Sequence, residues 1–97
     1  MKKIWRYTLE ASIDQRLEIL IPSDHKILTV QAMIRDRSVS IWALVDESTP
    51  QVPVVIRTIF TGQPIPDNPG EYIGTFQADG GNVVVHVFKE LEPRILT

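Results

Sequence analysis

Hydrophobic and polar residues alternate along most of the chain. The alternation is clear in residues 3–9, where Trp5, Tyr7 and Leu9 share one side, and it returns in residues 16–21, 26–33, 38–46, 52–60, 72–77 and 83–88. A period of two is typical of half-buried β-strands. We therefore predict an all-β fold: an antiparallel sheet or meander of about seven short strands, built as a compact sandwich or an open barrel. Residues 13–18 are the one window with helical character, and it is too short to form a stable helix.

Four local features refine this prediction. Residues 38–46 carry apolar side chains on both faces, with Trp42 on the less apolar one, which favours a central strand or an interface. Pro53 confines the start of its strand to an edge or a bulge. The sequence Asp-Gly-Gly-Asn at residues 79–82 predicts a hairpin turn. In residues 26–33 the alternation places Leu28 on the same side as Val30 and Ala32.

Composition narrows the class of protein. The 97 residues suit one domain, 1–97, and 43% apolar with 23% charged residues is typical of a globular protein. The net charge of −2 argues against a duplex-DNA binder that works through a basic face. The absence of cysteine excludes disulfide scaffolds, cysteine-ligated metals and thiol catalysis. No apolar run is long enough for a secretory signal or a membrane span, so we expect a cytoplasmic protein with no membrane contact.

Catalytic motifs are missing. The chain has no G-x-S-x-G, H-E-x-x-H, phosphate-loop or G-x-G-x-x-G sequence. Its two histidines, His25 and His86, match no zinc-ligand spacing. We therefore predict that the protein is not an enzyme and that it uses no metal and no cofactor. His25 is interpreted as a turn residue, and His86 as either a hydrogen-bonded side chain on a strand or a ligand contact.

Arg57 is a candidate for contact with an anionic ligand. It lies in the middle of an otherwise apolar strand, where a cation must be paired or exposed. Its guanidinium could bind a phosphate or a carboxylate, or it could simply face solvent. Trp42, Phe60 and Tyr72 could stack on a flat ring, or pack in the core or at an interface.

A stiff loop supplies the polar candidates. Residues 62–70 contain three prolines and two glycines, and such loops hold polar groups in fixed directions. Gln63 and Asn68 within this loop, with Thr75 and His86 on the following strands, could bind the edges of a base. The alternative is a plain connection between hairpins.

Several motifs resemble a family of short proteins of tailed phages and prophages. They are Trp-Ala-Leu-Val-Asp at residues 42–46, Gly-Gln-Pro-Ile-Pro at 62–66, Tyr-Ile-Gly-Thr at 72–75 and His-Val-Phe at 86–88. The resemblance covers nearly the whole chain and implies a viral protein in the host cytoplasm, without catalytic residues. The chain departs from the family pattern at Phe60, where glycine is expected, and at Val85, where tryptophan is expected.

The leading functional hypothesis is a phage-encoded binding protein that sequesters a small anionic ligand. The specific ligand it names is a cyclic nucleotide signal of bacterial antiviral defence, by analogy of context with viral sponge proteins. One alternative is an inhibitor that docks on a host protein through Trp5, Trp42 and residues 95–96; another is a minor virion or assembly component. A small β domain with few edge defences also predicts a homo-oligomer, a dimer or tetramer, with Trp42 or Trp5 at the contact and the ligand pocket near the subunit junction.

Overall fold

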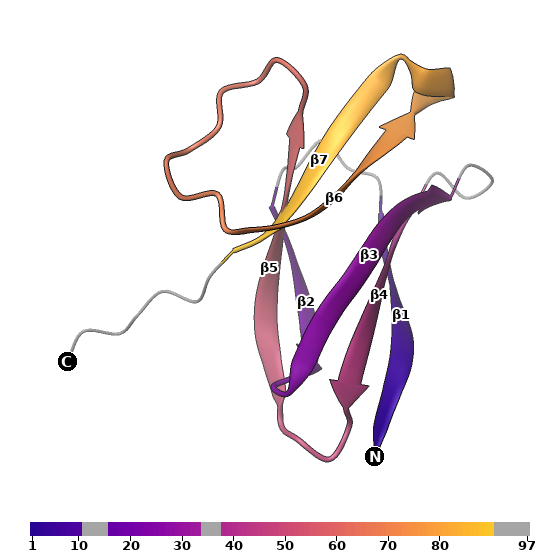
Figure 1. The fold of residues 1–97 in the computed structure, drawn as a ribbon, viewed down its shortest axis with the longest axis vertical. Coiled ribbons are helices and arrows are strands. Elements are labelled where there is room, and N and C mark those ends of the chain that lie inside the picture. Colours follow the sequence, from indigo (N-terminus) through magenta and orange to yellow (C-terminus); the bar gives the residue numbers. More distant parts are fainter. Residues whose placement is uncertain (11–15, 34–37, 91–97) are drawn as a thin grey trace.

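The chain folds into two antiparallel sheets that enclose one core (Figure 1). The computed structural model describes residues 1–10, 16–33 and 38–90. Its strands are β1 (Lys2–Glu10), β2 (Arg16–Pro22), β3 (His25–Met33), β4 (Ser38–Asp46), β5 (Gln51–Phe60), β6 (Glu71–Ala78) and β7 (Val83–Lys89). The three-stranded sheet has the order β1-β4-β3, and the four-stranded sheet has the order β2-β5-β7-β6. The predicted all-β fold of about seven strands is confirmed, in the form of a sandwich.

The core lies between the inner faces of the two sheets. Ile41 and Val45 of β4 belong to the same buried cluster as Ile56 of β5 and Val87 of β7, and each of the four is 0% exposed. β1 and β3 pair with β4 on either side, so the predicted central position of residues 38–46 is confirmed. Burial of alternate residues on both sheets is what the period of two in the sequence requires.

Pro53 lies in a part of β5 that has only one neighbouring strand. It pairs with Leu20 of β2, whereas β7 pairs only with residues 56–60 of β5. The Val55 carbonyl, two residues further on, accepts a hydrogen bond from the Glu90 N–H at 2.9 Å, just past the end of β7. Residues two apart in a strand direct their backbone groups to the same side, so the nitrogen of Pro53 faces the side of β5 on which β7 has already ended. The N–H that proline lacks therefore has no partner strand to lose there. The predicted edge position of this proline is confirmed.

β3 departs from strict alternation at one residue. Its register with β4 shifts between Ile27 and Thr29, which makes Leu28 the extra residue of a β-bulge. Ile27 consequently packs against the core, Leu28 is 43% exposed, and Val30 is buried again. The prediction that Leu28 shares a face with Val30 is wrong, because the bulge shifts the phase of the side chains by one residue.

The loop of residues 61–70 is a crossover connection. β5 and β6 are both antiparallel to β7, which lies between them, so they run parallel to each other and the loop must return along the sheet. Figure 1 shows it leaving the upper end of β5 and returning to the start of β6. It ends at Gly70, where φ is +108° and an added Cβ would lie 2.1 Å from the Lys89 carbonyl oxygen. Only glycine fits this position.

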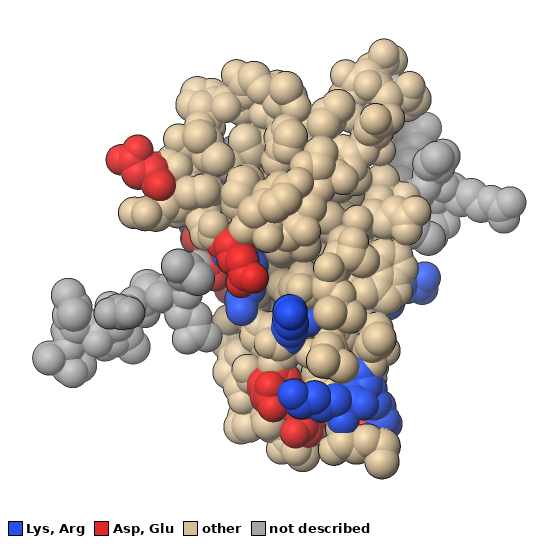
Figure 2. Space-filling model, viewed as in Figure 1, with Lys and Arg blue, Asp and Glu red and all other residues tan. Residues whose placement is uncertain are grey.

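The β6–β7 connection is the hairpin that the sequence predicts. A short 3₁₀ turn, Asp79–Gly81, joins the two strands, with positive φ at Gly80 and Gly81. Figure 2 shows one group of charged side chains at the lower end of the molecule and a second group at mid-height on the left of this view. Residues 95–96, part of the alternative docking surface, lie outside the described residues. Most of the window 13–18 does as well, and its residues 16–18 begin β2.

Candidate functional site

The outer face of the four-stranded sheet, turned away from the core, collects the polar and aromatic candidates. The strand registers place two rows of side chains across it. The first row is Arg16–Arg57–Phe88–Tyr72, and the second is Ile59–His86–Thr75. In the first row the rings of Tyr72 and Phe88 meet edge to face, with centroids 5.5 Å apart. Cations therefore lie beside aromatic rings on one continuous surface.

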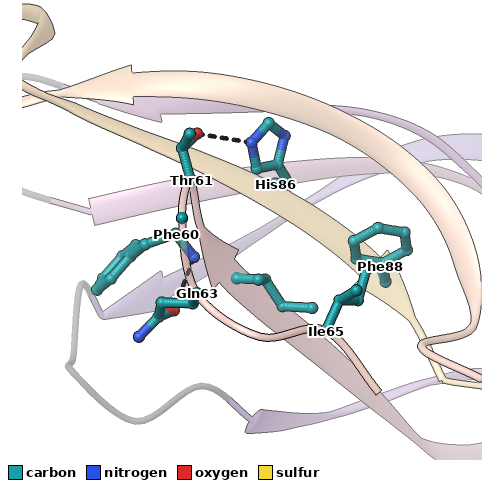
Figure 3. Close-up of a pocket in the computed structure, with 8 residues that line it drawn as sticks. Phe60, Thr61, Gln63, Ile65, His86 and Phe88 are labelled. Atoms are coloured by element: carbon teal, nitrogen blue, oxygen red, sulfur yellow. Dashed lines mark hydrogen bonds between the residues drawn. The ribbon is translucent and has the colours of Figure 1, made fainter. Parts of the chain in front are cut away.

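The crossover loop covers part of this face and leaves a hollow (Figure 3). The hollow has a volume of about 240 Å³ and is lined by Ile59, Phe60, Thr61, Gly62, Gln63, Ile65, His86 and Phe88. Ile59 is only 5% exposed although it faces away from the core, because the loop lies over it. Ile65, which is 54% exposed, lines the hollow from the loop side, and Phe88 lines it from the sheet. The hollow is mostly apolar, with Thr61, Gln63 and His86 as its polar groups.

A chain of hydrogen bonds runs from β6 across β7 to the first residue of the crossover loop. Tyr72 Oη lies 2.6 Å from Thr75 Oγ1, which lies 3.0 Å from His86 Nδ1, and His86 Nε2 lies 2.8 Å from Thr61 Oγ1. Thr61 also donates its hydroxyl proton to the Val84 carbonyl at 3.3 Å. A hydroxyl has one proton, so Thr61 accepts from His86, and Nε2 carries the imidazole proton. This pattern assigns the Nε2–H tautomer to neutral His86. Nδ1 then accepts the hydroxyl proton of Thr75, and Thr75 accepts that of Tyr72.

The two arginines of the first row share one carboxylate. Arg16 donates to both oxygens of Glu90, at 2.6 and 3.0 Å, and Arg57 Nε donates to Glu90 at 3.2 Å. The hydrogen bond from Arg16 holds the pKa of Glu90 below its usual value. The contact with Arg57 lowers this pKa further, whereas partial burial acts in the opposite direction. The same contact raises the pKa of Arg16. Two guanidinium groups and one carboxylate leave the cluster with a net charge of +1.

Gln63 has a structural task within the loop. Its side-chain Oε1 accepts a hydrogen bond from the Phe60 N–H at 2.8 Å, and its own N–H donates to the Phe60 carbonyl at 3.0 Å. These two bonds close the turn that begins the loop. The loop entrance is held further by the Thr61 N–H, which donates to the Val84 carbonyl at 3.0 Å. The hollow is therefore bounded by a fixed wall.

Comparison with known proteins places the chain in a family. Residues 1–96 match the family described as Domain of unknown function (DUF7352). The chain belongs to the DUF7352 family. No curated protein and no solved structure matches the chain. The family description states no activity, so the phage setting and the ligand remain predictions.

In this DUF7352 domain the predicted site residues do not all meet. Arg57, Tyr72, Thr75 and His86 share the outer face of the four-stranded sheet, and Gln63 borders the hollow. The registers of β5, β6 and β7 are sufficient to bring these four strand residues onto one face.

The other three candidates do not share this outer face. Phe60 lines the hollow, but it pairs with Val85, which is buried, so its ring is on the other side of the sheet from His86, and Figure 3 shows it directed away from Phe88. Asn68 is exposed in the loop. Trp42 is half-buried on the three-stranded sheet, paired with Arg6 and Thr29.

Sequence reasoning missed other residues of the DUF7352 site. Phe88, Ile65 and Ile59 line the hollow, and Arg16 and Glu90 complete the charged cluster. The one available signal was that His86 and Phe88 lie two residues apart on one strand and so face the same way. Across the described parts of the chain, no group of three histidine, aspartate or glutamate side chains could hold a metal ion. None of the described segments forms a helix long and apolar enough to cross a membrane.

Proposed function

We propose that this domain is a non-enzymatic binding protein for a small anionic ligand that carries a planar ring. The observation that carries the proposal is the cross-strand row Arg57–Phe88–Tyr72, in which Arg57 lies directly beside Phe88, and Phe88 both pairs with Tyr72 and lines the hollow. A ring would enter the hollow, and the anionic group would meet Arg57. The specific hypothesis, a cyclic nucleotide defence signal held by a phage protein, names a ligand of this class.

Arg57 has hydrogen-bond donors to spare. Its Nε contacts Glu90, and no other acceptor contacts its guanidinium among the described residues. The side chain is 23% exposed, so the remaining N–H groups reach solvent beside the aromatic pair. A partly desolvated guanidinium binds phosphate or carboxylate through paired charge-assisted hydrogen bonds. This is the chemistry an anionic ligand requires.

The hollow limits the size of what enters it. Drug-sized ligands occupy pockets of about 300–1,000 Å³. A volume of about 240 Å³ suits a single ring system, with the rest of the ligand outside. Phe88 and Ile65 supply apolar contact, and His86 and Gln63 supply polar atoms at the rim. A nucleotide with its base in the hollow and its phosphate at Arg57 fits this division.

A catalytic interpretation would rest on Thr61 and His86, whose 2.8 Å contact resembles a nucleophile–base pair. Two features favour binding instead. Thr61 donates its proton to the Val84 carbonyl, so it does not offer that proton to His86. The group that orients His86 is the hydroxyl of Thr75, which cannot stabilise an imidazolium as a carboxylate does.

The test is equilibrium binding followed by analysis of the ligand. Purified protein is mixed with cyclic di- and trinucleotides and with mononucleotides, and depletion from the filtrate is measured. We expect a nucleotide to be depleted at micromolar protein and recovered intact after the protein is denatured. Recovery of a cleaved product would show an enzyme, and no depletion of any nucleotide would refute the proposal.

Variants locate the site. Arg57→Gln removes a charge-assisted hydrogen bond worth about 1.5–3 kcal/mol, which corresponds to at least about tenfold weaker binding. Arg6→Gln, on the other sheet, removes the same charge and should leave nucleotide affinity unchanged. Glu90→Gln should strengthen binding, because it removes the carboxylate that competes for Arg57. Equal losses in Arg57→Gln and Arg6→Gln would place binding elsewhere.

A further inference from the structure

A second surface lies on the opposite side of the sandwich, on the outer face of the three-stranded sheet. Its side chains come from β1, β4 and β3, at the positions that alternate with the core residues. Ile4 is 61% exposed and Leu28 is 43% exposed, and Trp42 and Leu44 are half-buried between their neighbouring strands. The cross-strand rows around Trp42 are Lys2–Asp46, Ile4–Leu44–Lys26 and Arg6–Trp42–Thr29, and the registers continue along this face with Thr8–Ser40–Gln31 and Glu10–Ser38–Met33.

The apolar part of this face is continuous. Ile4 pairs directly with Leu44, and Trp42 is the next outward-facing residue of the same strand. Leu28, the extra residue of the β3 bulge, lies between the two positions that pair with Ala43 and Trp42. The bulge thus exposes a large apolar side chain beside Trp42. A patch of this kind on a small domain marks an interaction surface.

The charge on this face is positive, although the chain as a whole has a net charge of −2. Lys2, Arg6 and Lys26 are exposed around the patch. Two carboxylate residues occupy positions on this face: Glu10, which pairs with Ser38 at its far end, and Asp46, which already accepts hydrogen bonds from the backbone N–H and the hydroxyl of Ser48. Within residues 1–10, 16–33 and 38–90, neither Arg6 nor Lys26 forms an ion pair.

We propose that this face, here called the Trp42 face (Ile4, Leu28, Trp42 and Leu44 with Arg6 and Lys26), docks an acidic segment of another protein. Apolar side chains of the segment would pack on Trp42, the type of residue that dominates binding energy at interfaces. Its carboxylates would meet Arg6 and Lys26 at the rim, where complementary charge gives specificity.

Other occupants fit the charges less well. A second copy related by a two-fold axis would bring this positive face against itself, and like charges across an interface are unfavourable. The predicted dimer through Trp42 is therefore one outcome of the test. A nucleic acid would have only three cations to contact, whereas affinity for phosphate backbones grows with the number of phosphates neutralised.

The experiment uses the full chain and a short synthetic peptide that alternates leucine and aspartate. A peptide that alternates leucine and lysine, and oligo(dT), are the controls. Binding is followed by tryptophan fluorescence, with Trp42→Phe identifying the reporting ring, and self-association is followed by light scattering. Arg6→Gln is compared with Lys3→Gln, which removes the same charge from the same strand at a position where the lysine pairs with Glu47.

We expect the acidic peptide to bind, with about threefold to tenfold weaker affinity in Arg6→Gln and little change in Lys3→Gln. Equal binding of the acidic and basic peptides would overturn the proposal, as would equal losses in the two variants. Preferential binding of oligo(dT) would assign the face to nucleic acid. Light scattering that shows a dimer, lost in Trp42→Ser, would assign the face to a second copy.

Discussion

Gly70 joins the crossover loop to the sheet, and its replacement by alanine tests whether that junction holds the binding face together. An alanine Cβ would lie 2.1 Å from the Lys89 carbonyl oxygen and 2.9 Å from Glu90 Cα, far inside contact distance. Both of these neighbours are backbone atoms, so no side-chain rotation relieves the clash. The loop, or the end of β7 that carries Glu90, must move.

The size of the effect follows from two separate costs. A non-glycine residue at positive φ costs about 1–2 kcal/mol, and forcing a group into filled space costs about 1–3 kcal/mol more. Gly62 provides the matched control, because its φ of +92° is similar and an added Cβ would meet no atom within 4 Å. Gly62→Ala therefore carries the first cost alone, and Gly70→Ala carries both.

Thermal unfolding followed by circular dichroism measures the difference. For a domain of this size, 1 kcal/mol shifts Tm by about 4–8 °C. We expect Gly62→Ala to lower Tm by about 4–16 °C and Gly70→Ala to lower it about 1.5 to 4 times as far. Where Gly70→Ala still folds, nucleotide binding should also weaken, since the clash displaces the crossover loop, whose Gln63 and Ile65 line the hollow. Equal Tm losses in the two variants would refute the proposed close contact between loop and strand.

Three further predictions concern stability and protonation. The lowered pKa of Glu90 means that its charged form stabilises the fold above the ordinary pKa of 4.5 and that this contribution is lost as pH falls through the lower folded value. The stability gap between wild type and Glu90→Gln should therefore narrow on acidification below pH 4.5, and a constant gap would contradict this. Ile56→Ala, at a position with 0% exposure, should cost about 2–5 kcal/mol in denaturant unfolding, against under about 1 kcal/mol for Ile65→Ala at 54% exposure. Nitrogen NMR of the two neutral histidines should show opposite tautomers: Nε2–H in His86, and Nδ1–H in His25, whose Nδ1 lies 2.6 Å from the Pro22 carbonyl. An Nδ1–H tautomer in His86 would disprove the assigned direction of the hydrogen-bond chain.

The candidate site could be predicted only in part. The expectation that a cation in an apolar strand must be paired or exposed left both outcomes open for Arg57. It could not identify Glu90, which lies 33 positions away and is brought close by the pairing of β5 with β7. Trp42 and Phe60 were predicted to bind a ring beside Arg57. Trp42 lies on the other sheet, and Phe60 faces the opposite side of the sheet that carries Arg57. Residue type indicates what a side chain can bind, whereas sheet and face decide which side chains can bind together.

The sequence by itself determined the strands and most of the inward-facing positions, because alternation with a period of two is a local property of the backbone. It also determined the hairpin at residues 79–82, where two consecutive glycines supply the positive φ angles that the turn needs. Only the tertiary structure decided which strands are neighbours and how they are aligned. The β3 bulge that exposes Leu28 and the crossover that lays Ile65 over the sheet both depend on pairing between distant segments. Such pairing depends on the fit between whole faces rather than on any residue's own preference, so both proposed surfaces become visible only in the folded chain.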